Sequence, residues 1–169
     1  MYTEDSYVER INKLVNELIG DLSVDMVIDP NSEKLEEFVA DEIYLIVREA
    51  VTNIKLHAQA ERAEIKLDIY PNRIHLFVQD DGRGFSLENI TKKPEGLMRI
   101  QESIKRLGAG YEIDTEDLDN GGVAHWIYIP LPILSVQTYR TTTRINFMPD
   151  EKVGNEREWG KMKYLNLIY

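Results

Sequence analysis

Two kinds of hydrophobic spacing run along the first third of this chain, and they predict helices and strands in turn. Between Ser6 and Gly20 apolar residues recur every three or four positions, which predicts an amphipathic helix that ends at Gly20. Residues 23–28 alternate polar and apolar over most of their length, as a half-buried strand does. A long helical pattern then runs from about residue 34 to about residue 60, with Asp41 as a point where it could be interrupted.

The middle of the chain predicts hairpins separated by one further helix. Alternating segments at 63–70 and 73–80 read as strands joined by a short turn, and residues 86–95 read as a polar loop. A helix is expected from Gly96 to Gly108, and short strands are expected at 111–114 and 125–129. Helices interspersed with mostly antiparallel hairpins predict the α+β class, as a two-layer α/β sandwich in which a mixed sheet carries helices on one face.

The chain divides into three parts on this pattern. We expect an N-terminal helix within residues 1–20, one folded domain over residues 21–135, and a C-terminal appendage over residues 136–169. The appendage shows no sustained period, and it is interpreted as either partly disordered or docked on the core.

Composition excludes several classes of protein. The formal net charge of −10 repels a phosphate backbone and argues against nucleic-acid binding, although a nucleotide can still bind where local donors or a cation gather. No apolar run approaches the roughly 18 residues that span a bilayer, and the N-terminus lacks a signal-peptide pattern. The absence of cysteine excludes disulfides and thiolate chemistry. A cytoplasmic domain is therefore expected, without direct membrane insertion.

A glycine turn follows the second strand of the central hairpin. Residues 79–85 read Gln-Asp-Asp-Gly-Arg-Gly-Phe, and the two glycines allow a flat ligand to approach the backbone without a Cβ in the way. Asp80, at the end of the strand, can offer a carboxylate to a planar amine. The alternative is an acidic hairpin turn without a ligand, since Asp-Gly is among the commonest turn dipeptides.

A polar stripe lies on the long helical stretch. At about 100° per residue, Glu42, Glu49, Asn53 and His57 fall within one quarter of the helix circumference, while the apolar residues gather on another face. Oxygen-bearing side chains of this kind suit Mg²⁺, which takes one or two protein oxygens and completes its shell from phosphates and water. The alternative is a solvated helix face, in which His57 only caps or pads the helix.

These two stretches together resemble a known family. Residues 48–60, Arg-Glu-Ala-Val-Thr-Asn-Ile-Lys-Leu-His-Ala-Gln-Ala, resemble the N-box of the GHKL (Bergerat-fold) ATPases. The Asp-x-Gly-x-Gly-Phe segment at 80–85 resembles the G1 box, and Gly96-Leu97 resembles a reduced G2 segment. The strand that ends at 129–132 resembles the usual last strand of the domain. The branch it looks most similar to is the catalytic domain of sensor histidine kinases that pair with LuxR-like response regulators.

The resemblance implies an ATP site with Mg²⁺. Asn53 would be the Mg²⁺ ligand that bridges to the phosphates, and Glu49 would orient the metal's water or act as a base. Asp80 would accept the adenine amino group. The remaining residues that it implies for ATP binding are His57, Gly82, Gly84, Phe85, Lys92, Lys93, Gly96 and Leu97. Residues 85–95 would form the ATP lid, and the first helix would be the remnant of a linker to a dimerisation domain.

The chain departs from the family pattern in ways that keep other functions open. Leu56 stands where the N-box usually has lysine, the G2 segment lacks its first glycine, and Val123 stands where threonine is common. No phosphoacceptor histidine is expected within the chain, since none of His57, His75 and His125 lies on an N-terminal helix in a phosphoacceptor-like setting. His75 and His125 are expected to be exposed on the sheet. The leading hypothesis is a histidine kinase catalytic domain that phosphorylates a histidine on a separate dimerisation domain and, through it, serves a response regulator. The alternatives are a degenerate binding module and a free-standing ATPase in which Glu49 activates water.

Overall fold

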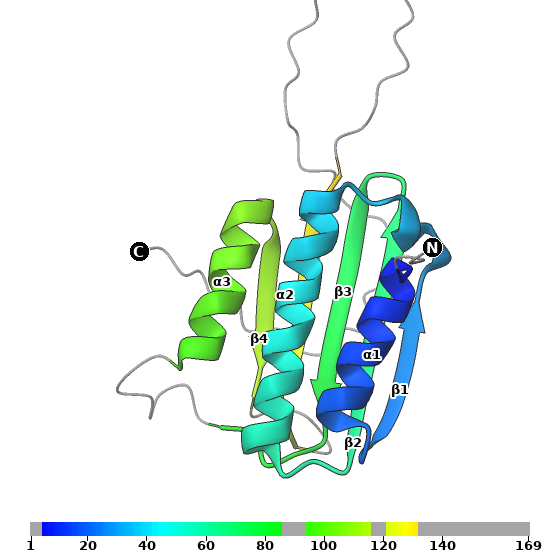
Figure 1. Cartoon of the computed structure of the whole chain (residues 1–169). Coiled ribbons are helices and arrows are strands. Elements are labelled where there is room, and N and C mark those ends of the chain that lie inside the picture. Colours follow the sequence, from blue (N-terminus) through cyan, green and yellow to red (C-terminus); the bar gives the residue numbers. More distant parts are fainter. Residues whose placement is uncertain (1–4, 86–93, 116–120, 132–169) are drawn as a thin grey trace, which may run out of the picture.

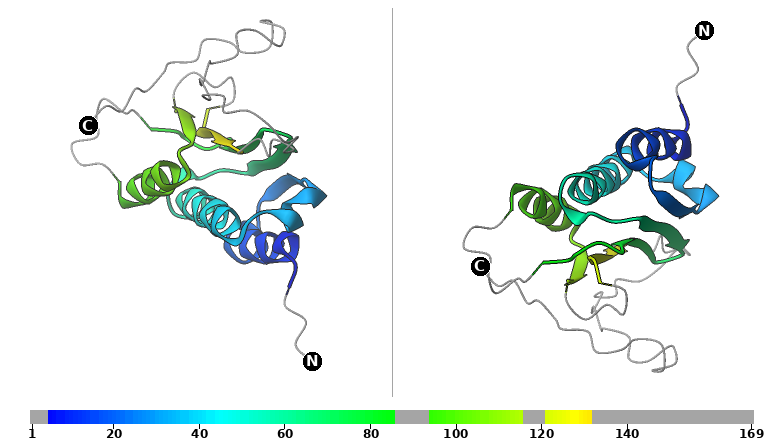
Figure 2. Two further views of the ribbon diagram at one scale, coloured as in Figure 1. Left: turned by 90° about the horizontal axis from the view of Figure 1, so that it is seen from above. Right: turned by 90° about the horizontal axis from the view of Figure 1, so that it is seen from below.

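The computed structural model describes residues 5–85, 94–115 and 121–131, which form one sheet with helices on one of its faces (Figure 1). Two further views show the helices in one layer and the strands in the other (Figure 2). The fold class predicted from the sequence is confirmed. The elements, in chain order, are α1 (Tyr7–Ile19), β1 (Ser23–Ile28), a 3₁₀ helix η1 (Pro30–Lys34), α2 (Glu37–Asn53), a π-type turn η2 (Ile54–Ala58), β2 (Arg62–Tyr70), β3 (Arg73–Asp80), α3 (Glu95–Leu107), β4 (Gly110–Asp114) and β5 (Ala124–Pro130).

The strand order is β1-β2-β3-β5-β4, with β1 parallel to β2 and every other neighbouring pair antiparallel. Side chains alternate between the two faces of a strand, and on β3 the buried set is Ile74, Leu76, Val78 and Asp80. Asp80 is therefore the last member of a row that points at the helices. The alternation that builds the core also aims this carboxylate into the helix layer.

The long helical pattern is interrupted at a different residue from the one expected, and its last turn is not α-helical. The interruption lies at Leu35, whose ψ of 146° is extended, and Asp41 sits inside an unbroken α2. At the other end the α-helix stops at Asn53, and the backbone widens into η2 before Gln59 turns left-handed at φ +56°. The helical stretch therefore reaches residue 58, close to the expected end at about residue 60, but its last turn is π-type. The wider turn rotates less per residue, which keeps His57 near the Asn53 side.

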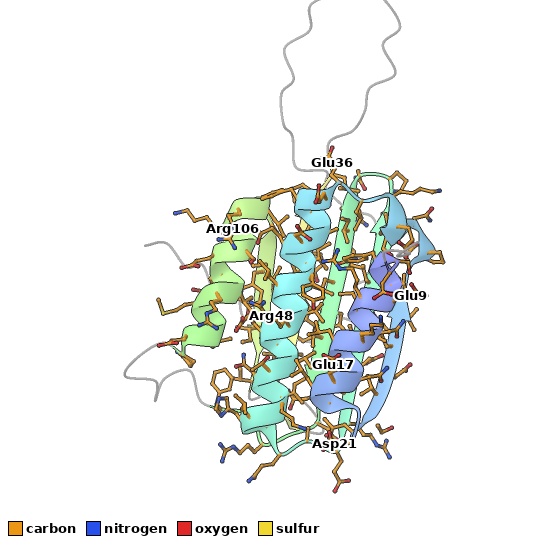
Figure 3. All side chains as sticks on the ribbon, in the orientation of Figure 1. Glu9, Glu17, Asp21, Glu36, Arg48 and Arg106 are labelled. Atoms are coloured by element: carbon orange, nitrogen blue, oxygen red, sulfur yellow. The ribbon has the colours of Figure 1, made fainter. Side chains whose placement is uncertain are left out.

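α2 and α3 are joined by ion pairs along their contact. Arg106 extends from α3, and Arg48 extends from α2 lower down (Figure 3). The Arg106 guanidinium donates to both carboxylate oxygens of Glu42, at 2.6 and 2.9 Å, and also to Ser103 Oγ at 3.1 Å. The hydrogen bonds from Arg106 hold the pKa of the Glu42 carboxyl below its usual value. Because Glu42 is only 6% exposed, this pair is a specific link between two elements that bound the site.

Glu42→Gln is expected to lower stability at neutral pH and to do so less as the solution is acidified. A carboxyl with a depressed folded-state pKa contributes stability above its unfolded pKa, and that contribution is lost as pH falls through the folded pKa. Asp41→Asn is the matched control, because Asp41 pairs with Arg10 at 3.5 Å on the exposed side of the same helix. Urea denaturation at pH 7 and pH 3 checks this. Equal effects of the two substitutions at pH 7 would contradict it.

Candidate functional site

A pocket of about 390 Å³ opens between α2, η2, the turn after β3, the start of α3 and the start of β5. It gathers residues that are up to 75 positions apart in the sequence, from Ala50 to His125. Apolar side chains make up much of its wall, and a few polar groups converge on it, as is usual for small-molecule sites. The lining residues are Ala50, Asn53, Ile54, His57, Ala58, Asp80, Arg83, Gly84, Phe85, Pro94, Leu97, Val123 and His125.

Asp80 forms one polar point on this wall. Its side chain is 4% exposed, and Oδ1 accepts a hydrogen bond from the Gly82 N–H at 2.8 Å. Burial raises the pKa of the Asp80 carboxyl, more than the hydrogen bond from Gly82 and the Val123 contact lower it. Gly82 and Val123 both supply backbone hydrogen bonds to this carboxylate, but an ionised carboxylate buried to this extent is still costly to keep. A carboxylate offers about four lone-pair sites, so the Asp80 carboxylate can accept a further hydrogen bond from a ligand.

The glycines around Asp80 allow close backbone packing. Gly84 has φ +61°, and a Cβ there would lie 2.5 Å from the Thr115 carbonyl oxygen. A Cβ on Gly82 would lie 2.4 Å from the Ala58 carbonyl oxygen. The two glycines of the turn are thus required by contacts within the chain itself, in addition to any role toward a ligand.

The turn after β3 is fastened to the end of the helix. Asp81 Oδ1 accepts from the backbone N–H groups of Glu61 and Arg62, each at 2.8 Å. The Arg83 N–H donates to the Ala58 carbonyl at 2.8 Å. These bonds hold the glycine turn against η2, and they fix the position of Asp80 relative to the last turn of α2.

Asn53 lies on the other side of the pocket, against the first turn of α3. A Cβ added at Gly96 would lie 2.8 Å from Asn53 Oδ1, so the carboxamide packs directly on that glycine. Leu97 from the same turn lines the pocket, and His57 lies on it one turn beyond Asn53. Leu56, by contrast, is 66% exposed.

The donor set around Asn53 fits a magnesium–phosphate group better than an all-protein metal site. Within the described ranges, no cluster of three or more acidic or histidine side chains could hold a metal ion. Mg²⁺ commonly binds through one or two protein oxygens together with phosphates and water, and an amide oxygen at a pocket wall meets that requirement. Asn53 would hold the ion, and the ion would supply charge neutralisation for the phosphates.

Glu49 lies on the same side of α2 as Glu42 and Asn53, toward α3, as the polar stripe predicted, but it does not line the pocket. Its side chain is buried at 6% exposure, and it is not among the residues that line the pocket. Its carboxylate pairs with Arg48 at 3.1 Å and with Arg99, in the first half of α3, at 3.3 Å. The helix face is thus neither solvated nor entirely directed at the pocket.

His125 is the site residue that the sequence reasoning missed. It was expected to be exposed on the sheet, but it is 5% exposed and lines the pocket. On β5 it shares the helix-facing parity with Ile127 and Ile129, and that alternation was the available signal. Its Nδ1 lies 2.8 Å from the Tyr111 hydroxyl on β4, and burial lowers the pKa of the His125 imidazole to about 4.

The remaining predicted site residues fall into three groups: those that line the pocket, those that pack beside it, and those outside the described residues. Gly84, Phe85 and Leu97 line the pocket, whereas Gly82 and Gly96 pack behind it against Ala58 and Asn53. Lys92, Lys93 and most of the predicted lid, together with the predicted appendage, lie outside the described residues. The roles assigned to all of these side chains stay predictions.

The mixed sheet covered by helices on one face is a fold that solved structures of histidine kinases share. The *Erythrobacter litoralis* EL346 blue-light activated histidine kinase aligns with a TM-score of 0.62 at 23% identity, covering 74% of this chain and 41% of that one. The *Acinetobacter baumannii* histidine kinase AdeS aligns with a TM-score of 0.57 at 16% identity, covering 75% and 64%.

The sequence comparisons identify the family. Residues 38–133, more than half of the chain, match the family described as "Histidine kinase-, DNA gyrase B-, and HSP90-like ATPase", and the chain belongs to it. The *Bacillus subtilis* sensor histidine kinase LiaS is 25% identical over 89% of this chain, and *Bacillus subtilis* YdfH is 32% identical over 65%. The chain spans 37% and 28% of the length of these two relatives. None of the helices in the described ranges has the length and apolar character that a membrane crossing requires.

Proposed function

We propose that this chain binds Mg-ATP in the pocket and donates the γ-phosphate to a histidine on a separate dimerisation domain, as part of two-component signalling with a response regulator. The observation that carries the proposal is that Asn53 and Asp80, 27 positions apart, line one pocket from different walls. Asp80 would accept the adenine amino group, and Asn53 would hold Mg²⁺, which would supply charge neutralisation for the phosphates. The family membership and the sensor histidine kinases among the relatives support this assignment. Placement in the cytoplasm belongs to the same proposal.

Phosphoryl transfer asks the protein mainly for positioning and charge neutralisation. The first turn of α3 packs against Asn53 and lines the pocket with Leu97, and the N–H groups of a helix N-terminus favour anionic phosphate oxygens. Glu49 would act as the base or would orient the metal's water. The domain boundaries at residues 20 and 135, and the role of α1 as the remnant of a linker, are proposed with it.

A second candidate function is a non-catalytic binding module of the same fold. The observation that favours it is the engagement of Glu49 by Arg48 and Arg99, which leaves its carboxylate off the pocket lining. In such a module the nucleotide would bind without transfer, and the pocket would serve to order the chain.

Calorimetric titration with Mg-ATP, followed by a transfer assay, separates the two. The chain alone is expected to bind Mg-ATP without becoming phosphorylated, and to label a separate fragment that bears an acceptor histidine helix. Glu49→Gln is expected to retain binding and to lower transfer by about 10²-fold or more. Glu102→Gln, at an exposed position of α3, is the control and should change neither. Binding without transfer to any acceptor would select the module, and the absence of binding would reject both.

A further inference from the structure

The buried histidine of β5 lies next to the proposed adenine acceptor. On the helix-facing side of the sheet, His125 is paired with Val78 in the β3–β5 register. Two residues further along both strands, the Asp80 N–H donates to the Val123 carbonyl at 3.0 Å. Asp80, Val123 and His125 all line the pocket. The side chain of Val123 can offer no hydrogen bond there, so His125 is the nearest side chain along β5 that can.

The Tyr111 hydroxyl determines which hydrogen-bonding role His125 can take. Tyr111 is partly buried, and burial raises the pKa of its hydroxyl above the usual value, so the phenol keeps its proton. A buried O–H with one partner donates to it, because an unpaired buried donor costs more than an unused lone pair. The hydroxyl therefore donates to Nδ1 across the 2.8 Å contact. The neutral imidazole then carries its own hydrogen on Nε2, which makes Nε2 a donor.

A protein that places a hydrogen-bond acceptor beside a hydrogen-bond donor can recognise the Watson–Crick edge of adenine. The Watson–Crick edge of adenine offers an amino donor on C6 next to an acceptor at N1, and guanine offers the reverse at both positions. Asp80 supplies the acceptor for the amino group. Without a second polar group, the pocket would make no hydrogen bond to N1 of adenine. Sites that hydrogen-bond a ligand group discriminate strongly, because the wrong ligand leaves buried polar groups unpaired.

We propose that His125 is a specificity-determining residue that donates from Nε2 toward N1 of adenine, with Tyr111 as the positioning residue that sets its tautomer. The proposal rests on the proposed function and deepens it, since it names the part of the nucleotide that this wall of the pocket recognises. Together with Asp80, the pair selects an adenine nucleotide over a guanine nucleotide.

The test is a calorimetric comparison of nucleotides that differ by one ring atom. ATP, 1-deaza-ATP, which lacks the N1 acceptor, and 7-deaza-ATP, which keeps it, are titrated with Mg²⁺ into the wild type and into His125→Phe. The wild type should bind 1-deaza-ATP about 3- to 10-fold more weakly than ATP, the size of one neutral hydrogen bond, and bind 7-deaza-ATP nearly as well as ATP. His125→Phe keeps the ring volume, and it should bind ATP and 1-deaza-ATP equally. Tyr111→Phe should show a smaller loss of discrimination.

The outcomes separate this inference from the proposed function. Binding of ATP and 1-deaza-ATP with equal affinity by the wild type would overturn the role of His125 and leave the function standing. If His125→Phe lowered the affinities for ATP and for 1-deaza-ATP by the same factor, His125 would have a structural role only. That result would also overturn the inference. If His125→Phe does not fold, as judged by circular dichroism, the wild-type comparison still decides. No binding of any nucleotide by the wild type would reject the function and the inference together.

Discussion

Asp80→Asn is expected to weaken Mg-ATP binding by roughly 100-fold, the scale of a lost hydrogen bond to a charged group plus a new clash between donors. The amide oxygen of asparagine can still accept from the Gly82 N–H, which the Asp80 carboxylate does at 2.8 Å. The amide nitrogen then faces the adenine amino group, so a donor meets a donor. Calorimetric titration with Mg-ATP measures this.

The same substitution is expected to leave the free energy of unfolding at pH 7 unchanged or raised. Burial raises the pKa of Asp80 in the folded protein, so its ionised form is held at a cost near neutral pH. That cost falls as pH drops through the raised folded-state pKa, because the folded state then takes up its proton. The difference between Asp80→Asn and the wild type should therefore shrink on acidification. Urea denaturation at pH 7 and pH 3 checks this.

Asp81→Asn is the matched control for Asp80→Asn, with the opposite expected profile. The Asp81 carboxylate accepts two backbone N–H groups at 2.8 Å, from Glu61 and Arg62, and does not line the pocket. Its substitution should lower stability and change ATP affinity little. A loss of ATP affinity in Asp81→Asn equal to that in Asp80→Asn would contradict the separation of their roles.

The side of the molecule on which Asp80 lies was predictable because strand alternation is a local property. The apolar residues 74, 76 and 78 fix the face of β3, and residue 80 follows by parity. The helix-facing residues of α2 were predictable for the same reason: Ile43, Val47 and Ala50 are all buried. Local periodicity was thus sufficient for the core and for one wall of the pocket.

Features that depend on a distant partner were not predictable. The spacing along α2 places Glu49 on the polar stripe. Its environment, however, is set by Arg99, 50 positions away on α3, and the spacing along α2 carries no information about that partner. The π-type turn after Asn53 is stabilised from outside, by the Arg83 N–H donating to Ala58. His125 was placed on the wrong face because a lone histidine in a strand is usually solvated, whereas here Tyr111 supplies the partner that permits burial.

Gly122→Ala is expected to cost about 3 kcal/mol or more of folding free energy, the sum of a left-handed strain and a backbone clash. Gly122 has φ +92°, and a Cβ there would lie 1.9 Å from the Asp80 carbonyl oxygen. Both partners are backbone, so no side-chain rotation relieves the contact. Relief requires the start of β5 to move away from β3.

Gly108→Ala separates the clash from the strain. Gly108 is also left-handed, at φ +60°, but a Cβ there has no atom within 4 Å. It should cost only about 1 kcal/mol, the strain alone. Urea denaturation gives both values, and equal losses would contradict the role of close packing. The movement forced by Gly122→Ala also shifts the Asp80 carbonyl and the Val123 wall, so the folded fraction of that variant should bind Mg-ATP more weakly than Gly108→Ala does.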